Sequence, residues 1–399
     1  MTRVRGLRAP RRAPPGGAPN EIETDVLEPA TPSRLAFADN LKVALVAGVI
    51  VAHATMAWTG LGGWVFEEPP AREPLLGVLR MVLVVGVLFG MPLFFLVAGT
   101  FTPASLERKG LRRFAADRTI RLLVPMAFFI LVFTPPVEYV DPGNAGWSRG
   151  YWAFVPYIWW QWPPPPGPTW FLAVLWVFSL AYALLRTRWP RRTPGAVPLR
   201  AWPLVVAAAT VTAASYLLRL AVPFGEERWH IAVAQAPGWI MGFTIGALAG
   251  EQGWFRSLEP GLAPRIRHVA WAAIVGCAVL VGIGVATGTD PELFAGGGTW
   301  QSAVFAMIEG VIVVTVSLWL VDLFRRRFNH QGALPRELSR AAYAAFLVHQ
   351  IVLVGLVLAS RQMPWPPELK YLAVSLLGVT LSFGFGAAVV RLPGVARIL

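Results

Sequence analysis

The first residues along the chain whose side chains are suited to chemistry are Lys42 and His53, which lie eleven positions apart in an apolar run. At about 3.6 residues per turn, this spacing places both side chains on one face of a helix, about 16 Å apart along its axis. An imidazole titrates near neutral pH, so His53 is a candidate general base toward a hydroxyl group. Asp39 precedes Lys42 by three positions and can pair with it. The alternatives are that His53 only bonds a neighbouring helix and that Lys42 only extends its amine to water.

Four further ionisable side chains interrupt apolar runs, namely Arg80, Arg219, Glu309 and His349. An unpaired carboxylate in an apolar setting is unfavourable, so Glu309 needs a partner. The candidate partners are His53, Arg80 and Arg219. Glu309 therefore either orients and charge-balances the site of His53 or forms a structural ion pair. Arg80 and Arg219 fit the ion pair better than catalysis, and we interpret His349 as a packing or orienting group.

A basic cluster lies between the second and third apolar runs. Arg118 and Arg121 are three positions apart and share one helix face, and Arg112 and Arg113 precede them. Planar guanidinium groups suit phosphate oxygens, so the cluster is a candidate phosphate site. The alternative is an ordinary basic surface. The sequence contains no P-loop and none of the dinucleotide-binding, zinc-protease or nucleophile-elbow motifs.

The composition places these residues in a membrane protein. Of 399 residues, 55% are apolar and 14% are charged, whereas a soluble domain has about 25% charged residues. This excludes a soluble enzyme, a disordered protein and a disulfide-rich secreted domain. The single cysteine, Cys277, lies in an apolar run, so we expect no internal disulfide, and we predict no metal site. Basic residues at the membrane surface explain the net charge of +13 better than nucleic-acid binding does.

Ten apolar stretches can each cross a hydrocarbon layer as a helix, which takes about 20 residues. They cover approximately residues 35–58, 75–101, 120–137, 168–185, 202–222, 231–250, 268–288, 300–321, 341–360 and 370–390. No stretch shows the sustained alternation of a β-barrel strand. We therefore expect an all-α polytopic membrane protein with about ten transmembrane helices in one domain, residues 34–399. Residues 1–33, rich in Pro, Gly and Arg, are expected to form a disordered cytoplasmic tail.

The lysines and arginines predict the orientation of these spans. Most of the 35 lie in the N-terminal tail, on every second connection or at the C-terminus. Only five lie on the alternate connections: Arg72, Arg149, Arg228, Arg361 and Lys370. Because basic connections stay in the cytoplasm, we predict that both termini are cytoplasmic and that the number of spans is even.

The connection at 138–167 is rich in tryptophan, tyrosine and proline. Aromatic side chains at this density are typical of the membrane interface. The alternative is a platform on which sugar rings stack, with Trp160 as a candidate contact.

Five segments between residues 34 and 360 resemble, in order, the motifs of the acyltransferase-3 family of bacterial integral-membrane acyltransferases. They are Asp39-Asn40-Leu41-Lys42 with His53; Phe94-Phe95-Leu96-Val97-Ala98-Gly99; Ser105 with Arg108-Lys109-Gly110, Phe114, Arg118, Arg121 and Pro125; Trp170-Phe171-Leu172; and Leu338-Ser339 with Tyr343 and Phe346-Leu347-Val348-His349. The chain departs from the family pattern at Lys42, Ala98 and Phe346, where Arg, Ser and Tyr are commoner. These departures bear on the substrate class more than on the chemistry.

The resemblance implies transfer of an acyl group, usually acetyl, from cytoplasmic acyl-CoA to a hydroxyl of a glycan, a lipid-linked sugar or a small-molecule acceptor. It places the chain in the bacterial cytoplasmic (inner) membrane. The expected roles are general base or acyl carrier for His53, support for Lys42 and Glu309, binding of the donor phosphates for Arg118, Arg121, Arg112 and Arg113, and acceptor contact for Trp170 and Trp160. The rival class is a proton-coupled secondary transporter, against which we find no convincing repeat between the two halves.

Overall fold

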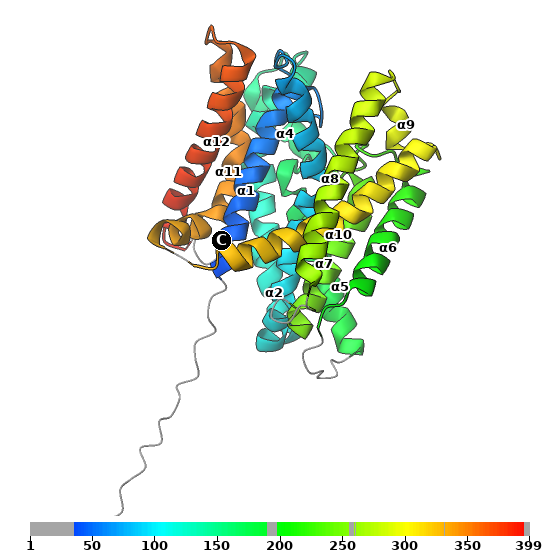
Figure 1. The fold of residues 1–399 in the computed structure, drawn as a ribbon. Helices are drawn as coiled ribbons and strands as arrows, with labels where there is room; N and C mark the ends of the chain where they lie inside the picture. Colours follow the sequence, from blue (N-terminus) through cyan, green and yellow to red (C-terminus); the bar gives the residue numbers. More distant parts are fainter. Residues whose placement is uncertain (1–35, 190–197, 255–258, 260, 331, 395–399) are drawn as a thin grey trace, which may run out of the picture. The chain divides into compact units, whose positions relative to one another are not determined.

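The computed structural model describes residues 36–189, 198–254, 259, 261–330 and 332–394. These ranges form helices and turns, with no strand among them beyond an isolated bridge between Arg228 and Ile231 (Figure 1). The protein is therefore all-α, as predicted. The predicted tail, residues 1–33, lies outside the described residues, as do Arg34, Arg191, Arg192 and Arg256.

The α-helices follow one another along the chain with short connections. In order they are α1 (Ala36–Thr59), α2 (Leu75–Phe128), α3 (Thr134–Tyr139), α4 (Tyr151–Trp160), α5 (Trp170–Arg188), α6 (Ala201–Arg219), α7 (Ala236–Gln252), α8 (Leu262–Ala286), α9 (Glu292–Ala295), α10 (Trp300–Arg327), α11 (Ala333–Arg361) and α12 (Pro367–Val390). Figure 1 shows α1, α11 and α12 on one side of the bundle and α6, α8 and α10 on the other.

Eight helical segments within the described residues are long and apolar enough to cross a membrane. One of them, Leu75–Tyr139, contains two of the predicted spans, and the 17-residue α7 coincides with a further one. Each of the ten predicted stretches thus coincides with a helix, and the chain is a multi-pass membrane protein. The number of ten crossings and the cytoplasmic position of both termini stay predictions.

The chain reverses direction inside α2, at Gly110. Its backbone angles there are φ 69° and ψ 164°, which glycine adopts without steric cost. Two contacts join the parts of α2 before and after this turn. Arg118 Nη2 lies 3.4 Å from Thr102 Oγ1, and Lys109 Nζ lies 2.6 Å from an Asp117 carboxylate oxygen. Residues 16 positions apart would be about 24 Å apart in a straight helix. α2 is therefore two helices that lie side by side, which corresponds to the two spans predicted there.

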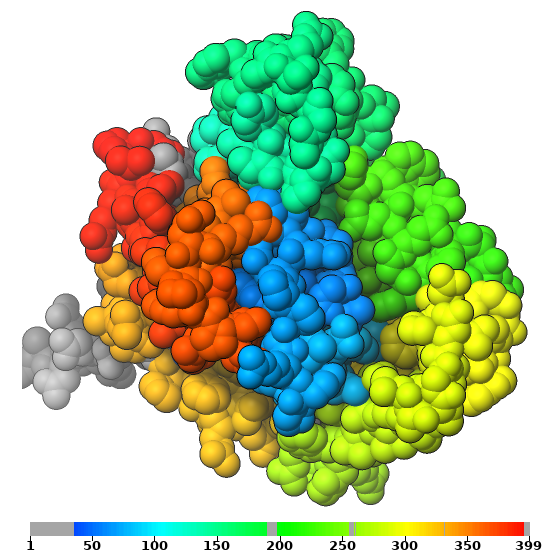
Figure 2. Space-filling model, turned by 90° about the horizontal axis from the view of Figure 1, so that it is seen from above, coloured from blue at the N-terminus to red at the C-terminus, as the bar shows by residue number. Residues whose placement is uncertain are grey.

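The two ends of the bundle differ in side-chain type. We call the end at which α2 reverses the basic end, because Lys109, Arg186 and Arg325 lie at helix ends there. We call the opposite end, which carries α4, the aromatic end (Figure 1). Figure 2 looks onto the aromatic end, where the α4 segment projects at one edge and residues of the early and late helices, in blue and orange, fill the centre.

A close crossing of α2 and α7 forms the middle of the bundle. Gly242, Gly246 and Gly250 recur every fourth position and face the carbonyl oxygens of Pro92, Leu96 and Thr100. A Cβ atom at these glycines would lie 2.2, 2.0 and 2.2 Å from those oxygens. Small residues at this spacing let two membrane helices approach to backbone contact.

This crossing makes Gly246 intolerant of any side chain. We expect Gly246→Ala to lower the free energy of unfolding by about 3 kcal/mol or more, the upper end of the usual cost of overpacking, because the obstacle is backbone. Thermal unfolding of the purified protein measures the change. Gly276→Ala on α8 is the matched control, since nothing lies within 4 Å of its new methyl group. Equal melting temperatures for the two variants would contradict the close crossing.

Candidate active site

His53 and His349 meet between α1 and α11. His53 Nδ1 lies 3.3 Å from His349 Nε2 and 2.9 Å from the carbonyl oxygen of Val49, one turn earlier in α1. His349 Nδ1 lies 2.5 Å from the carbonyl oxygen of Phe346. The His349 side chain is 0% exposed, whereas His53 is half-buried. His53 is thus the histidine of the pair that a substrate can reach.

Trp64 covers His53 on the side of the aromatic end. Their ring centroids lie 5.1 Å apart, and the indole N–H of Trp64 is buried without a partner among the described residues. Trp64 follows a turn in which Gly60, Gly62 and Gly63 all have positive φ angles. The sequence interpretation did not single out Trp64, although a glycine-rich turn after a predicted span is a signal for a close-packed loop.

The loop that carries Trp64 is held to the ends of α1 and α11. Glu68 N–H donates to the Ala57 carbonyl at 2.8 Å, and Arg361 Nε donates to Glu68 Oε1 at 2.6 Å. The Arg361 guanidinium lies 4.4 Å from the ring centroid of the buried Phe66. These contacts hold the loop in place, so that Trp64 stays packed against His53.

Lys42 lies at the basic end, three helical turns from His53. Its ammonium group pairs with an Asp39 carboxylate oxygen at 2.9 Å, which confirms the predicted pairing. The neighbouring Asn40 Nδ2 donates to the carbonyl oxygens of Phe328 and His330, at 2.7 and 2.9 Å. This end of α1 thus anchors the end of α10, and three helical turns separate Lys42 from His53.

Glu309 is bonded to Arg219 rather than to His53. Arg219 Nη2 lies 2.5 Å from Glu309 Oε2, and both side chains are almost fully buried. The rings of Phe224 and Phe305 lie 4.7 and 5.0 Å from the guanidinium carbon. Arg80, another candidate partner, instead donates two hydrogen bonds to the Thr59 carbonyl at the end of α1. This geometry favours the structural ion pair for Glu309.

The predicted phosphate cluster follows the turn at Gly110. Arg118 is half-buried, lies over the Phe114 ring at 5.3 Å, and has a buried Nε without a partner in the described part of the chain. Asp117 pairs with Lys109 at 2.6 Å and with Arg121 at 3.2 Å. Arg118 therefore keeps a buried N–H group that a bound anion could accept from.

The rest of the cluster is exposed or tied to α11. Arg112 and Arg113 lie on the surface. Tyr343 OH donates to the Arg121 carbonyl oxygen at 2.6 Å, which joins the cluster to α11. Tyr343 precedes His349 by six positions, about 9 Å of helical rise. α11 thus connects the basic cluster to the histidine pair.

The two candidate acceptor contacts do not come together. Trp170 is partly buried and packs against the core residue Trp239, with ring centroids 4.6 Å apart. Trp160 lies at the end of α4 and is 87% exposed. The rings of Trp147 and Tyr157 stack beside α4 at 4.8 Å, which favours an interfacial aromatic layer there.

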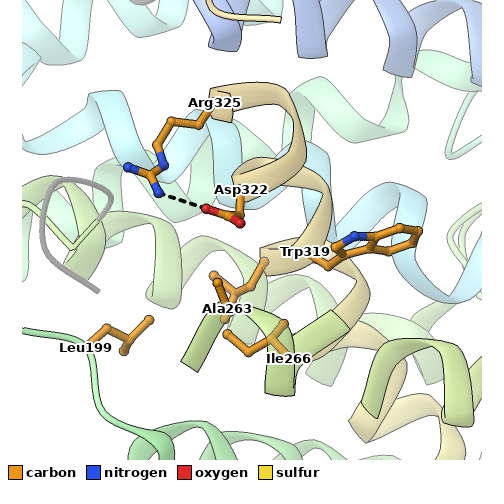
Figure 3. A pocket seen from close by; sticks show the side chains of 7 residues that line it. Leu199, Ala263, Ile266, Trp319, Asp322 and Arg325 are labelled. Carbon is orange, nitrogen blue, oxygen red and sulfur yellow. Dashed lines mark hydrogen bonds and ion pairs between the residues drawn. The ribbon is translucent and has the colours of Figure 1, made fainter. Parts of the chain in front are cut away.

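Two hollows in the structure lie away from the histidine pair. Figure 3 shows a pocket at the basic end, between α8 and α10, where Asp322 forms an ion pair with Arg325 at 2.8 Å. Its volume of about 10 Å³ admits a single water molecule. An open groove of about 460 Å³ on α8 and α10 is lined by apolar side chains, as a surface in contact with lipid would be. Within the described ranges, no group of three or more His, Cys, Asp or Glu side chains is placed to hold a metal ion.

The fold and the site define a polytopic membrane protein with a partly buried histidine pair between two of its helices. A family model for an acyltransferase domain, that of the acyltransferase-3 family, matches residues 35–387, nearly the whole chain. The chain belongs to this family and is a membrane acyltransferase. No curated protein and no solved structure matches the sequence significantly.

Proposed function

We propose that the protein transfers an acyl group, usually acetyl, from acyl-CoA to a hydroxyl of a glycan, a lipid-linked sugar or a small-molecule acceptor in the cell envelope. The observation that carries this proposal is the half-buried His53, whose Nδ1 lies against His349 and whose Nε2 has no hydrogen bond among the described residues. The family supplies acyl transfer, and the histidine supplies a group that can take the proton of a hydroxyl.

The proposed reaction uses His53 as a general base. The acceptor hydroxyl gives its proton to His53 while its oxygen forms a bond to the thioester carbonyl carbon. The carbon–sulfur bond then breaks, and the departing thiolate of CoA takes the proton from His53. Alternatively, His53 first attacks the thioester carbonyl carbon, and the carbon–sulfur bond breaks so that CoA leaves as a thiolate. The acceptor oxygen then displaces His53 from the acyl carbon, and the hydroxyl proton passes to solvent, from which the thiolate takes one up. Both routes need the same ring nitrogen of His53 to be free.

The basic cluster supports binding of the donor from the basic end. The Arg121 carbonyl is bonded to Tyr343 on α11, six positions before His349, so the phosphates of acyl-CoA can bind at this cluster while the thioester extends along α11 toward His53. We propose that this end faces the cytoplasm of a bacterial cell, with both termini on that side, and that the acceptor reaches His53 from the aromatic end. The basic residues concentrated at one end support this orientation.

Arg118→Ala tests the donor site. We expect the concentration of acyl-CoA needed for half-maximal transfer to rise about tenfold or more, because a hydrogen bond to a charged group contributes about 1.5–3 kcal/mol. Arg265→Ala, an exposed arginine at the start of α8, is the matched control. Steady-state transfer at varied acyl-CoA concentrations gives the comparison. An unchanged requirement in Arg118→Ala would remove the phosphate role.

Release of CoA tests the proposed function. The purified protein in nanodiscs is given acetyl-CoA and longer acyl-CoA donors, with and without an extract of envelope glycans and lipids. The proposal predicts release that depends on the extract and yields an O-acylated product. A proton-coupled transporter would instead move a solute in sealed vesicles without consuming acyl-CoA. No release by the folded protein with any donor or extract would contradict the proposal.

A further inference from the structure

We propose that His349 is a positioning residue that holds His53 in one neutral tautomer, protonated at Nδ1, and so leaves Nε2 of His53 as the reacting atom. The catalytic part of this inference rests on the proposed function. The tautomer itself is a property of the folded protein and can be measured without any transfer assay.

Three contacts determine which nitrogens carry protons. The Phe346 carbonyl oxygen can only accept, so His349 Nδ1, 2.5 Å away, must donate to it. In a neutral His349 ring, Nε2 is then unprotonated and can only accept. His53 Nδ1, 3.3 Å from that atom, must therefore carry its proton.

The backbone of α1 supports the same assignment. The Val49 carbonyl oxygen, also only an acceptor, lies 2.9 Å from His53 Nδ1. The opposite pair of tautomers would set lone pairs against each other at Phe346 O and at Val49 O. One assignment thus satisfies all three contacts, and it shares the His53 Nδ1 proton between two acceptors.

The free edge of the His53 ring follows from this assignment. Among the described residues, no hydrogen bond is made to His53 Nε2, and His53 as a whole is half-buried. When Nε2 takes the acceptor's proton, the positive charge is stabilised by Val49 O and His349 Nε2 at the opposite edge. When Nε2 instead carries an acyl group, the same two acceptors hold the ring in position. His349 acts through His53 and touches no reacting atom.

Nitrogen-15 NMR of histidine-labelled protein in lipid measures the tautomers directly. The chain has five histidines, so the signals of the pair can be assigned from their loss in His53→Ala and His349→Phe. We expect both rings to be neutral at pH 7, each with a protonated Nδ1 and an unprotonated Nε2. A wild-type His53 protonated at Nε2 would overturn the inference.

A matched pair of variants tests the catalytic consequence. In His349→Gln, the amide oxygen can occupy the place of Nε2 and accept from His53, whereas in His349→Asn the amide reaches only the place of Nδ1. We expect His349→Asn to lower kcat about 10- to 100-fold, by analogy with histidines that ligate metals, where loss of the hydrogen bond to the other ring nitrogen has this effect, and to shift the His53 tautomer. His349→Gln should keep most of the wild-type kcat and the wild-type tautomer of His53. Neither variant should change KM for acyl-CoA.

The outcomes separate this inference from the proposed function. Transfer that requires His53 but proceeds at the wild-type rate in His349→Asn would overturn the positioning role and leave the function standing. Equal loss in the folded Gln and Asn variants would also overturn it. A third outcome is that NMR finds the expected tautomers but no acyl transfer depends on His53. This outcome would support the geometry and overturn the proposed function. If both variants fail to fold, the wild-type tautomer still decides.

Discussion

His53→Ala is expected to reduce acyl transfer by about 10²- to 10⁴-fold, the usual contribution of a general base. The substitution removes the nitrogen that takes the hydroxyl proton or carries the acyl group. Binding of acyl-CoA at Arg118 should persist, because the contacts of Arg118 are with Thr102 and Phe114 and do not involve His53. Transfer rates with labelled acetyl-CoA and equilibrium binding of CoA measure the two properties separately.

The control for this variant is another histidine in the same bundle. His268 lies exposed on α8, so His268→Ala should keep wild-type transfer. Size-exclusion and melting profiles of His53→Ala show whether the bundle is intact. Transfer retained in a folded His53→Ala protein would remove His53 from the reaction.

Arg219→Ala is expected to lower the free energy of unfolding by about 3–5 kcal/mol, because it leaves the Glu309 carboxylate buried without its cation. A double variant, Arg219→Met with Glu309→Leu, should recover most of this loss, since apolar side chains can replace a buried ion pair. Unfolding of the three proteins in the same detergent measures the difference.

The double variant also separates the two interpretations of Glu309. A structural ion pair predicts that the double variant keeps its transfer activity per folded molecule. A stable double variant without activity would assign Glu309 to the site of His53. An Arg219→Ala protein as stable as wild type would contradict the buried pair itself.

Local sequence patterns predicted much of the architecture. Hydropathy found the ten stretches, because burial in lipid needs a long apolar run, and three-residue spacing predicted the pair of Asp39 and Lys42. Hydropathy does not locate helix ends, however. In the structure, α2 extends to Lys109 and resumes after Gly110 through polar residues. The sequence predicted only a basic connection there.

Contacts between distant helices were not predictable. His53 and His349 are separated by 296 positions, and no pattern in one sequence specifies which faces of two helices meet. Glu309 had three candidate cations for the same reason. The crossing of α2 and α7 did have a local signal, the four-residue spacing of Gly242, Gly246 and Gly250. Trp160 was predicted as an acceptor contact from the aromatic-rich connection and Trp170 from its resemblance to a family motif, but Trp160 is exposed and Trp170 is partly buried against the core.

Transfer of label across a sealed vesicle tests the central claim most directly. Protein is reconstituted with its basic end outward, acetyl-CoA labelled in the acetyl group is supplied outside, and envelope extract is enclosed inside. The account predicts labelled O-acetyl product from the wild type and background labelling from His53→Ala. Label that stays in acetyl-CoA with folded wild-type protein, or equal labelling by His53→Ala, would contradict it.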